Sequence, residues 1–134
     1  MGPMDHPRPL KEVVKIFKAL SDPARLRIML LLWRRELCVC ELMFILGMEQ
    51  SRISHHMRIL REAGIAEGFR ERQWIIYRIP ERAHILLGSF FAGALLEQTE
   101  HSREASADIK KLDRCIRENM RARVCGIQSR KDGR

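Results

Sequence analysis

Two cysteines, Cys38 and Cys40, stand one residue apart in the segment ELCVCEL of a 134-residue chain that contains four cysteines. The first nine residues, MGPMDHPRP, lack an apolar signal region, so we expect a cytoplasmic protein. Thiols in that reducing compartment act as ligands for soft metals or as redox sensors more often than as structural disulfides. The cysteine pair therefore predicts a thiol site that binds a metal-like ion or responds to oxidants.

The spacing of the two thiols restricts the backbone that carries them. On a regular helix, side chains two residues apart point about 200° away from each other, to nearly opposite sides. Both sulfurs can bind one small atom only where the backbone is not helical. The sequence predicts a short helix over residues 39–46, so the pair lies at its beginning, where the first turn frays and its partial positive charge favours thiolates.

Two further helices are predicted before the cysteine pair. Apolar residues recur at helical spacing over residues 10–20. Asp22 is a suitable N-cap and Pro23 a suitable first residue for a second helix over residues 23–34. That second helix is apolar on nearly all sides, so we expect it at the centre of the core.

The segment after the cysteines has the pattern of a helix-turn-helix. Gly47 ends the short helix, and an amphipathic helix with a polar and basic face follows over residues 50–63. After Gly64 the apolar period changes to two, and residues 65–69 and 74–79 read as strands joined by a charged turn. Such a hairpin is the wing of a winged helix. The sequence therefore predicts a mainly α fold with a β-hairpin wing.

The polar face of helix 50–63 and the hairpin turn are candidate DNA contacts. The net charge of +8 favours a polyanionic partner. Arginine reads guanine and glutamine reads adenine, whereas basic residues on a wing contact the backbone or a minor groove. One alternative is an ordinary solvated polar surface. Another is a helix-turn-helix that contacts a protein, with the basic tail binding an acidic partner. The candidate DNA contacts are Gln50, Ser51, Arg52, Ser54, His55 and Arg58 on the helix, and Arg70 and Arg72 on the turn.

The terminal helices are predicted to form a subunit interface. A long helix is expected from residue 81 to about residue 124, and its first half is too apolar to remain exposed. We expect a flexible arm (1–9), a winged helix-turn-helix domain for DNA binding and dimerisation (10–99), and a charged helical extension and tail (100–134). The predicted interface residues are Leu10, Val14, Phe17, Leu86, Phe90, Phe91 and Leu95.

Four blocks of the sequence together resemble the ArsR/SmtB family of metal-sensing bacterial repressors. They are KALSDPARLRI, ELCVCEL, SRISHHMRILREAGI and WIIYRI, which occur in this order within roughly residues 10–96. The resemblance implies a homodimeric winged helix-turn-helix repressor that binds a pseudo-palindromic double-stranded operator and holds no permanent cofactor. It also implies that ELCVCEL is an arsenic-sensing motif, with Cys38 and Cys40 as ligands of As(III), whose binding releases the operator.

One position departs from the arsenical pattern. The family's motif has a third cysteine three residues after the second, where this chain has Met43. A thioether cannot ionise and is a poor ligand for trivalent arsenic. Three solutions remain open. Cys115 or Cys125 supplies a third sulfur, from the same or the partner subunit; two thiols and a water hold the arsenic; or the inducer is an organoarsenical with only two exchangeable positions.

Other inducers also fit the cysteines. A redox or reactive-sulfur sensor could join Cys38 to Cys115, because Cys38 and Cys40 alone would form a strained ring. A zinc or cadmium sensor is a third alternative, although no C-x-x-C pair is present and His84 and His101 stand alone. No catalytic triad, phosphate loop or HExxH segment points to an enzyme, and no apolar run is long enough for a membrane span.

Overall fold

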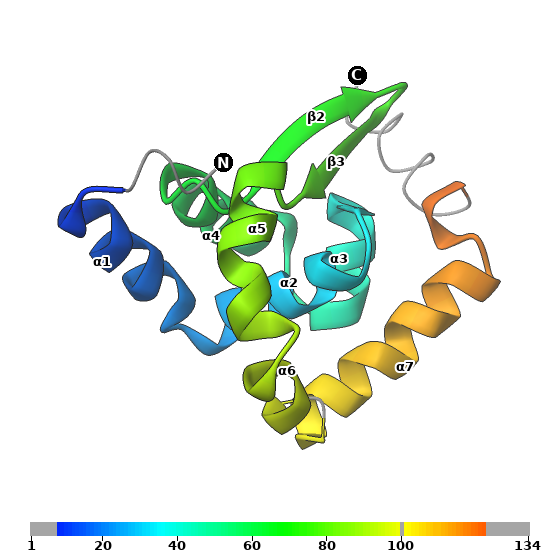
Figure 1. Cartoon of the computed structure of the whole chain (residues 1–134). Coiled ribbons are helices and arrows are strands. Elements are labelled where there is room, and N and C mark those ends of the chain that lie inside the picture. Colours follow the sequence, from blue (N-terminus) through cyan, green and yellow to red (C-terminus); the bar gives the residue numbers. More distant parts are fainter. Residues whose placement is uncertain (1–7, 100, 123–134) are drawn as a thin grey trace.

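The computed structural model describes residues 8–99 and 101–122 as a helical bundle with a projecting hairpin (Figure 1). Most of the predicted arm, and Cys125 in the tail, lie outside the described residues. The mainly α fold with a β-hairpin wing is confirmed. In chain order the elements are α1 (Leu10–Leu20), α2 (Pro23–Arg34), β1 (Leu37–Cys38), α3 (Val39–Leu46), α4 (Gln50–Glu62), β2 (Glu67–Glu71), β3 (Trp74–Arg78), α5 (Glu81–Phe91), α6 (Ala94–Thr99) and α7 (Arg103–Arg117).

Local capping interactions set the bounds of the first helices as predicted. The Asp22 carboxylate accepts hydrogen bonds from the backbone N–H groups of Ala24 at 2.8 Å and Arg25 at 3.2 Å, which caps α2. Gly47 adopts the left-handed conformation (φ 65°) at the end of α3, where a residue with a Cβ atom would be strained. The turn between α3 and α4 is therefore fixed by the backbone itself.

The core is built around α2, which runs through the middle of the molecule (Figure 1). Ile28 and Met29 of α2 are completely buried. Helix α4 packs on this core through three residues spaced four and three apart, which leaves its other face to solvent. These three buried residues of α4 are Ile53, Met57 and Leu60.

The sheet has three antiparallel strands in the order β1-β3-β2. Strands β2 and β3 form the predicted wing, with Glu71 paired to Trp74 across a two-residue turn. Strand β1 was not predicted, because a two-residue strand leaves no alternating pattern. Its pairing places Cys38 opposite Ile76 of β3, so the wing is hydrogen-bonded to the segment that carries the first thiol.

The prediction of one long helix from residue 81 onward is wrong. The chain breaks after Phe91 and again after Thr99, giving three helices. The hydroxyl of Ser102 caps α7 by accepting a hydrogen bond from the N–H of Ala105 at 3.1 Å. Gly93 and Ser102 were sequence signals for these two breaks, and the continuous apolar run masked them.

Helix α7 folds back along α2 and α3 instead of extending away (Figure 1). Arg27 of α2 donates two hydrogen bonds to the buried Asp108 of α7, at 2.7 and 2.9 Å. Leu112 and Cys115 of α7 are buried in the main core. Within residues 8–99 and 101–122, none of the helices has the length and hydropathy needed to traverse a membrane.

Candidate inducer site and nucleic-acid interface

Cys38 is the residue at which the chain passes from strand β1 into helix α3. Its backbone is extended (φ −85°, ψ 166°), and it is the N-cap of α3. Cys38 and Glu41 form a capping box: the Cys38 side chain faces the Glu41 N–H, and the Glu41 carboxylate accepts a hydrogen bond from the Cys38 N–H at 2.8 Å. Of the two cysteines only Cys40 belongs to the helix. The two sulfurs are therefore not held on opposite sides of one regular helix, and they can share a ligand.

The two thiols border the same small apolar cluster. Cys38 and Ile76 are its buried members, and the half-buried Cys40 packs against them together with Phe69 and Trp74. The indole N–H of Trp74 is a buried donor with no hydrogen-bond partner among the described residues. A ligand at these thiols would therefore meet strand β3 of the wing and an available hydrogen-bond donor.

Glu41 connects the thiol region to the C-terminal part of the chain. Its buried carboxylate accepts two hydrogen bonds from Arg121, at 3.1 and 2.9 Å. Burial raises the pKa of Glu41, the charge of Cys38 raises it further, and the Cys38 N–H and Arg121 oppose these effects. Sequence analysis missed Glu41, although Cys38-x-x-Glu41 has the spacing of a capping box with cysteine in place of serine.

Cys115 is a third thiol in this region. It is buried on α7, and its Sγ lies 3.8 Å from the Sδ of Met120. Burial raises the pKa of Cys115 to about 11, and the neighbouring charges of Glu41 and Cys38 add to the effect. The thiol is therefore protonated at neutral pH.

The thiols do not form a finished metal site in this conformation. Among residues 8–99 and 101–122, no three histidine, cysteine, aspartate or glutamate side chains gather closely enough to hold a metal ion. A ligand that needs three sulfurs must therefore draw the thiols together. The structure places Cys38 and Cys40 beside one cluster and Cys115 in the adjoining core, whereas Cys125 lies outside the described residues.

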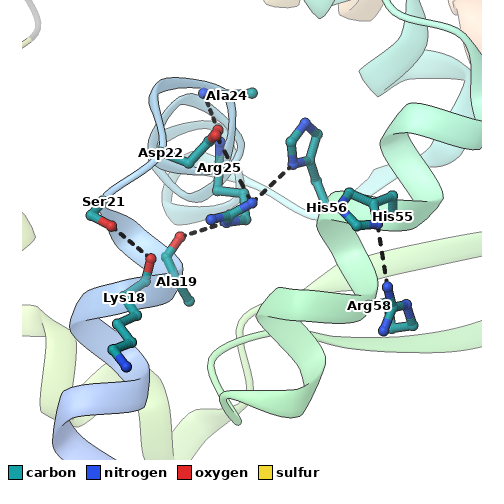
Figure 2. Close-up of polar contacts among 9 residues, drawn as sticks. All are labelled: Lys18, Ala19, Ser21, Asp22, Ala24, Arg25, His55, His56 and Arg58. Atoms are coloured by element: carbon teal, nitrogen blue, oxygen red, sulfur yellow. Dashed lines mark hydrogen bonds and ion pairs between the residues drawn. The ribbon is translucent and has the colours of Figure 1, made fainter.

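The candidate DNA contacts of α4 all lie on its exposed face. Within this set, Arg58 contacts His55 at 3.3 Å (Figure 2). Arg58 also contacts Glu62 at 3.5 Å along the exposed side of the helix. The exposed residues of the predicted set on this helix are Gln50, Ser51, Arg52, Ser54, His55 and Arg58. This face carries hydrogen-bond donors and positive charge without apolar interruption.

His56 lies on the opposite side and is buried. Figure 2 shows its ring turned toward Arg25, whose Nη1 lies 3.3 Å from Nδ1 of the histidine. Arg25 in turn donates to the carbonyl oxygen of Ala19 at 2.8 Å, so the contact ties α4 to the junction of α1 and α2. Burial lowers the pKa of His56, and the charge of Arg25 lowers it further against the opposing charge of Asp22.

The wing presents two of its arginines to solvent and uses a third for packing. Arg70 is exposed near the end of β2, and Arg72 occupies the turn with a positive φ of 60°. Arg78 lies 4.4 Å over the ring of Phe69 and donates to Glu67 at 2.7 Å. Arg70 and Arg72 thus remain the candidates for contacts outside the molecule.

An apolar face of α1 is exposed on the surface of the protein. Leu10, Val14 and Phe17 follow one another at helical spacing and are 79%, 42% and 54% exposed. Leu86 is half-buried against the core, and the side chains of Phe90 and Leu95 lie outside the described ones. We refer to Leu10, Val14 and Phe17 as the α1 face.

Phe91 does not belong to an exposed interface, which corrects the prediction. It is completely buried, and its ring meets that of Trp33 edge-on at 5.6 Å between ring centres. The apolar residues of α5 were predicted to face a second subunit. Instead, Phe91 fills the core of its own chain, because α5 packs across α2.

Comparison with known proteins identifies related regulators. Residues 22–67 match the profile of the family described as bacterial regulatory protein, arsR family. The chain is 45% identical over 78 residues to the arsenic resistance transcriptional regulator ArsR1 of Pseudomonas putida, a match that covers 58% of this chain and 61% of that protein. It thus spans less than two thirds of the length of that relative.

Two further relatives differ in what their names say. An uncharacterized HTH-type transcriptional regulator of Methanocaldococcus jannaschii is 41% identical over 70 residues, which cover 52% of this chain and 79% of that protein. The cadmium resistance transcriptional regulatory protein CadC homolog of Staphylococcus aureus is 38% identical over 71 residues, 52% of this chain and 59% of that protein. The sequence relatives are thus transcriptional regulators, one named for arsenic resistance and one for cadmium resistance.

Solved structures agree with the fold. The homodimeric winged helix-turn-helix domain Mb0332 of Mycobacterium bovis, a possible ArsR-family regulator, has a TM-score of 0.59 at 30% identity, covering 70% of this chain and 87% of that one. The transcriptional repressor BigR of Xylella fastidiosa has a TM-score of 0.53 at 33% identity, covering 69% and 95%. Both matches support a winged helix-turn-helix, and the first is a homodimer.

Proposed function

Because the chain belongs to the arsR family of bacterial regulatory proteins, we propose that it is a homodimeric transcriptional repressor that releases its operator when trivalent arsenic binds Cys38 and Cys40. It has no resident cofactor in this role and acts in the cytoplasm, where operator DNA lies. The observation that carries the proposal is the capping box, in which the Cys38 side chain holds the first turn of α3.

DNA binding is supported by the surface that α4 and the wing present. The exposed face of α4 would enter the major groove, with Arg52 and Gln50 as candidate base readers. Arg70 and Arg72 of the wing would contact the backbone or a minor groove. The α1 face would join two subunits, so that the two copies of α4 read the two halves of a pseudo-palindromic operator.

Arsenic binding would act on α3 through the thiols themselves. Each cysteine thiol replaces a hydroxide of As(OH)3, and the thiol proton leaves with that hydroxide as water. A ligand shared by Cys38 and Cys40 draws the Cys38 sulfur away from the Glu41 N–H and opens the capping box. Helix α3 packs against α4, so a shift of its first turn changes the placement of the DNA-reading face. A differential affinity of a few kcal/mol for the two states is enough to shift the population.

Fluorescence anisotropy of labelled DNA from the protein's own upstream region tests this function. TCEP keeps the protein reduced without competing as a thiol. We expect arsenite to release the wild-type protein and to leave Cys38→Ser and Cys40→Ser bound, with unchanged affinity before arsenite is added. If both variants still dissociate in arsenite, the switch is not at these thiols.

Two alternatives are separated in the same assay. The burial of a third thiol, Cys115, on the helix that packs against α3 favours a redox or reactive-sulfur switch, although the raised pKa of Cys115 disfavours the thiolate that oxidation requires. A relative named for cadmium resistance favours cadmium or zinc. Release by peroxide or polysulfide after TCEP has been removed, and reversal when TCEP is added back, would support the first alternative. Release by cadmium alone would support the second.

A further inference from the structure

Arsenite has three exchangeable hydroxides, but the ELCVCEL motif offers only two thiols. Met43 stands where the arsenical motif has its third cysteine, and it is half-buried against the main core. A thioether does not lose a proton and therefore cannot replace hydroxide as a thiol does. The third position of the arsenic must be filled from elsewhere in the protein or by water.

Helix α7 is held firmly against the helices that carry this site. Arg27 and Asp108 join it to α2 through a two-bond ion pair at 2.7 and 2.9 Å. Lys111 donates to the carbonyl oxygen of Ile45 in α3 at 3.3 Å. Just beyond α7, Arg121 binds the carboxylate of Glu41 in the first turn of α3 at 2.9 Å. These contacts fix both ends of α7 relative to the thiol pair.

Cys115 lies on the buried side of α7 between these anchoring contacts. It is 1% exposed, and its Sγ lies 3.8 Å from the sulfur of Met120. It belongs to the same buried core as Leu42 of α3, and α7 packs directly against α3. Helix α7 thus buries a third thiol in the core that adjoins the cluster of Cys38 and Cys40, and Arg121, just beyond α7, binds Glu41.

We propose that Cys115 of α7 is the third arsenic ligand, so that the C-terminal extension forms one wall of the inducer site. This inference rests on the proposed function and specifies the ligand set of that same site. Because Cys115 is buried within its own chain, it completes the site from the same subunit. Cys115 then supplies the third sulfur, which in the arsenical motif comes from a cysteine at the position of Met43.

The chemistry balances without an oxidant. Three thiols and As(OH)3 give three As–S bonds and three molecules of water, and every sulfur keeps its oxidation state. Cys38 and Cys40 react first, because Cys115 is buried and its thiol has a pKa of about 11. Reaction of Cys115 then pulls α7 toward β1 and α3. This closure strains the Arg121–Glu41 contact and the capping box together, which couples the third bond to the movement of α3.

Arsenicals with different numbers of exchangeable positions test the proposal. Arsenite has three such positions, whereas phenylarsenite has two and needs only Cys38 and Cys40. In the operator-release assay, Cys115→Ser should raise the arsenite midpoint by about tenfold or more, the scale on which loss of a supporting group weakens a metal site. The phenylarsenite midpoint should stay at the wild-type value. Cys125→Ser is the matched control and should leave both midpoints unchanged.

X-ray absorption at the arsenic edge supplies a direct count of ligands. We expect three As–S bonds in the wild-type protein, and two As–S bonds with one As–O bond in Cys115→Ser. Because a buried serine hydroxyl would lack a partner, Cys115→Val is a second variant that keeps an apolar side chain in the core. It should give the same two-sulfur signature with a wild-type thermal midpoint.

Each contrary result identifies a different error. Three As–S bonds in both Cys115 variants would overturn the proposal, as would loss of the arsenite response in Cys125→Ser alone. Two As–S bonds and one As–O bond in the wild-type protein would mean that water, and not Cys115, fills the third position. If neither arsenical releases the operator from the wild-type protein, the proposed function itself is rejected.

Discussion

Arg121 and Glu41, which are 80 residues apart in sequence, form a partly buried ion pair between the segment just beyond α7 and the first turn of α3. The Nε and Nη2 atoms of Arg121 lie 3.1 and 2.9 Å from the same carboxylate oxygen. That oxygen also accepts the backbone N–H of Cys38 at 2.8 Å. One carboxylate oxygen thus connects the C-terminal extension to the N-cap of the helix that carries the thiols.

Arg121→Met should destabilise the protein by about 1–3 kcal/mol, because Glu41 would lose a partner while remaining buried. Glu41→Gln combined with Arg121→Met should recover part of that loss, since an amide oxygen can still accept the Cys38 N–H. Urea denaturation measures both changes. The control is Arg114→Met, whose pair with Glu118 is exposed and should contribute about 0–1 kcal/mol. Equal effects of Arg121→Met and Arg114→Met would contradict this role of Glu41.

The sequence was sufficient to predict those parts of the fold that depend on local signals. Asp22 before Pro23 and Gly47 after an apolar run are capping residues whose preferences act within one turn, so the helix bounds followed from them. The alternation of apolar and polar residues after Gly64 predicted the wing, since the side-chain period of a strand is also a local property. The exposed face of α4 followed from its amphipathic spacing.

The remaining features depend on contacts between distant segments. Strand β1 exists because Cys38 pairs with Ile76, and a two-residue strand has no periodicity of its own. His56 is buried because Arg25, 31 residues earlier, supplies a donor for its ring. The position of Cys115 relative to the N-terminus of α3 depends on how α7 folds back. The strongly charged sequence of α7 did not indicate this.

His56 should make the stability of the protein sensitive to acid. The arginine can only donate, so Nδ1 of His56 accepts from Arg25 and the ring is neutral. Burial lowers the pKa of His56 below 6.5, Asp22 opposes this effect, and Arg25, His55 and Arg52 add to it. As the pH decreases, the unfolded chain therefore binds a proton at His56 before the folded protein does. The free energy of unfolding is thus highest above pH 6.5 and falls as the pH decreases from there.

Urea midpoints measured between neutral and mildly acidic pH test this prediction. His56→Gln keeps an acceptor for Arg25 but does not titrate, so it should flatten the pH dependence. His55→Gln alters the exposed neighbouring histidine and should retain the parental slope. An unchanged slope in His56→Gln would show that another group causes the loss of stability.

Phe17→Glu should convert the proposed homodimer into monomers. It places a charge in the middle of the α1 face, where burial against a second subunit would leave the carboxylate without a partner. Sedimentation velocity measures the oligomeric state. Ile116→Glu is the control, because Ile116 is exposed to a similar extent (48% against 54%) but lies on α7. If only Ile116→Glu is monomeric, the subunit interface lies on α7 and not on α1.

Arg52→Ala should weaken operator binding by roughly 1–3 kcal/mol and relax sequence preference at one position in each half-site. The reason is that Arg52 lies exposed near the N-terminus of α4, where a recognition helix meets base edges. Competition binding with operators mutated at single positions measures both effects. Arg103→Ala removes an exposed arginine from the beginning of α7 and should change neither. If Arg52→Ala loses the same affinity for operator and for unrelated DNA, Arg52 contacts phosphates and not bases.

Arg72→Gly should weaken DNA binding without harming the fold, because glycine adopts the positive φ of 60° at this turn more readily than arginine does. If Arg72 contacts phosphate, the loss will be similar for all sequences. The slope of log K against log salt should then become shallower by about two per dimer, one for each wing. Arg72→Lys keeps the charge and should retain most of the slope. A wild-type slope in Arg72→Gly, with the operator still bound, would mean that the tip of the wing does not reach the DNA backbone.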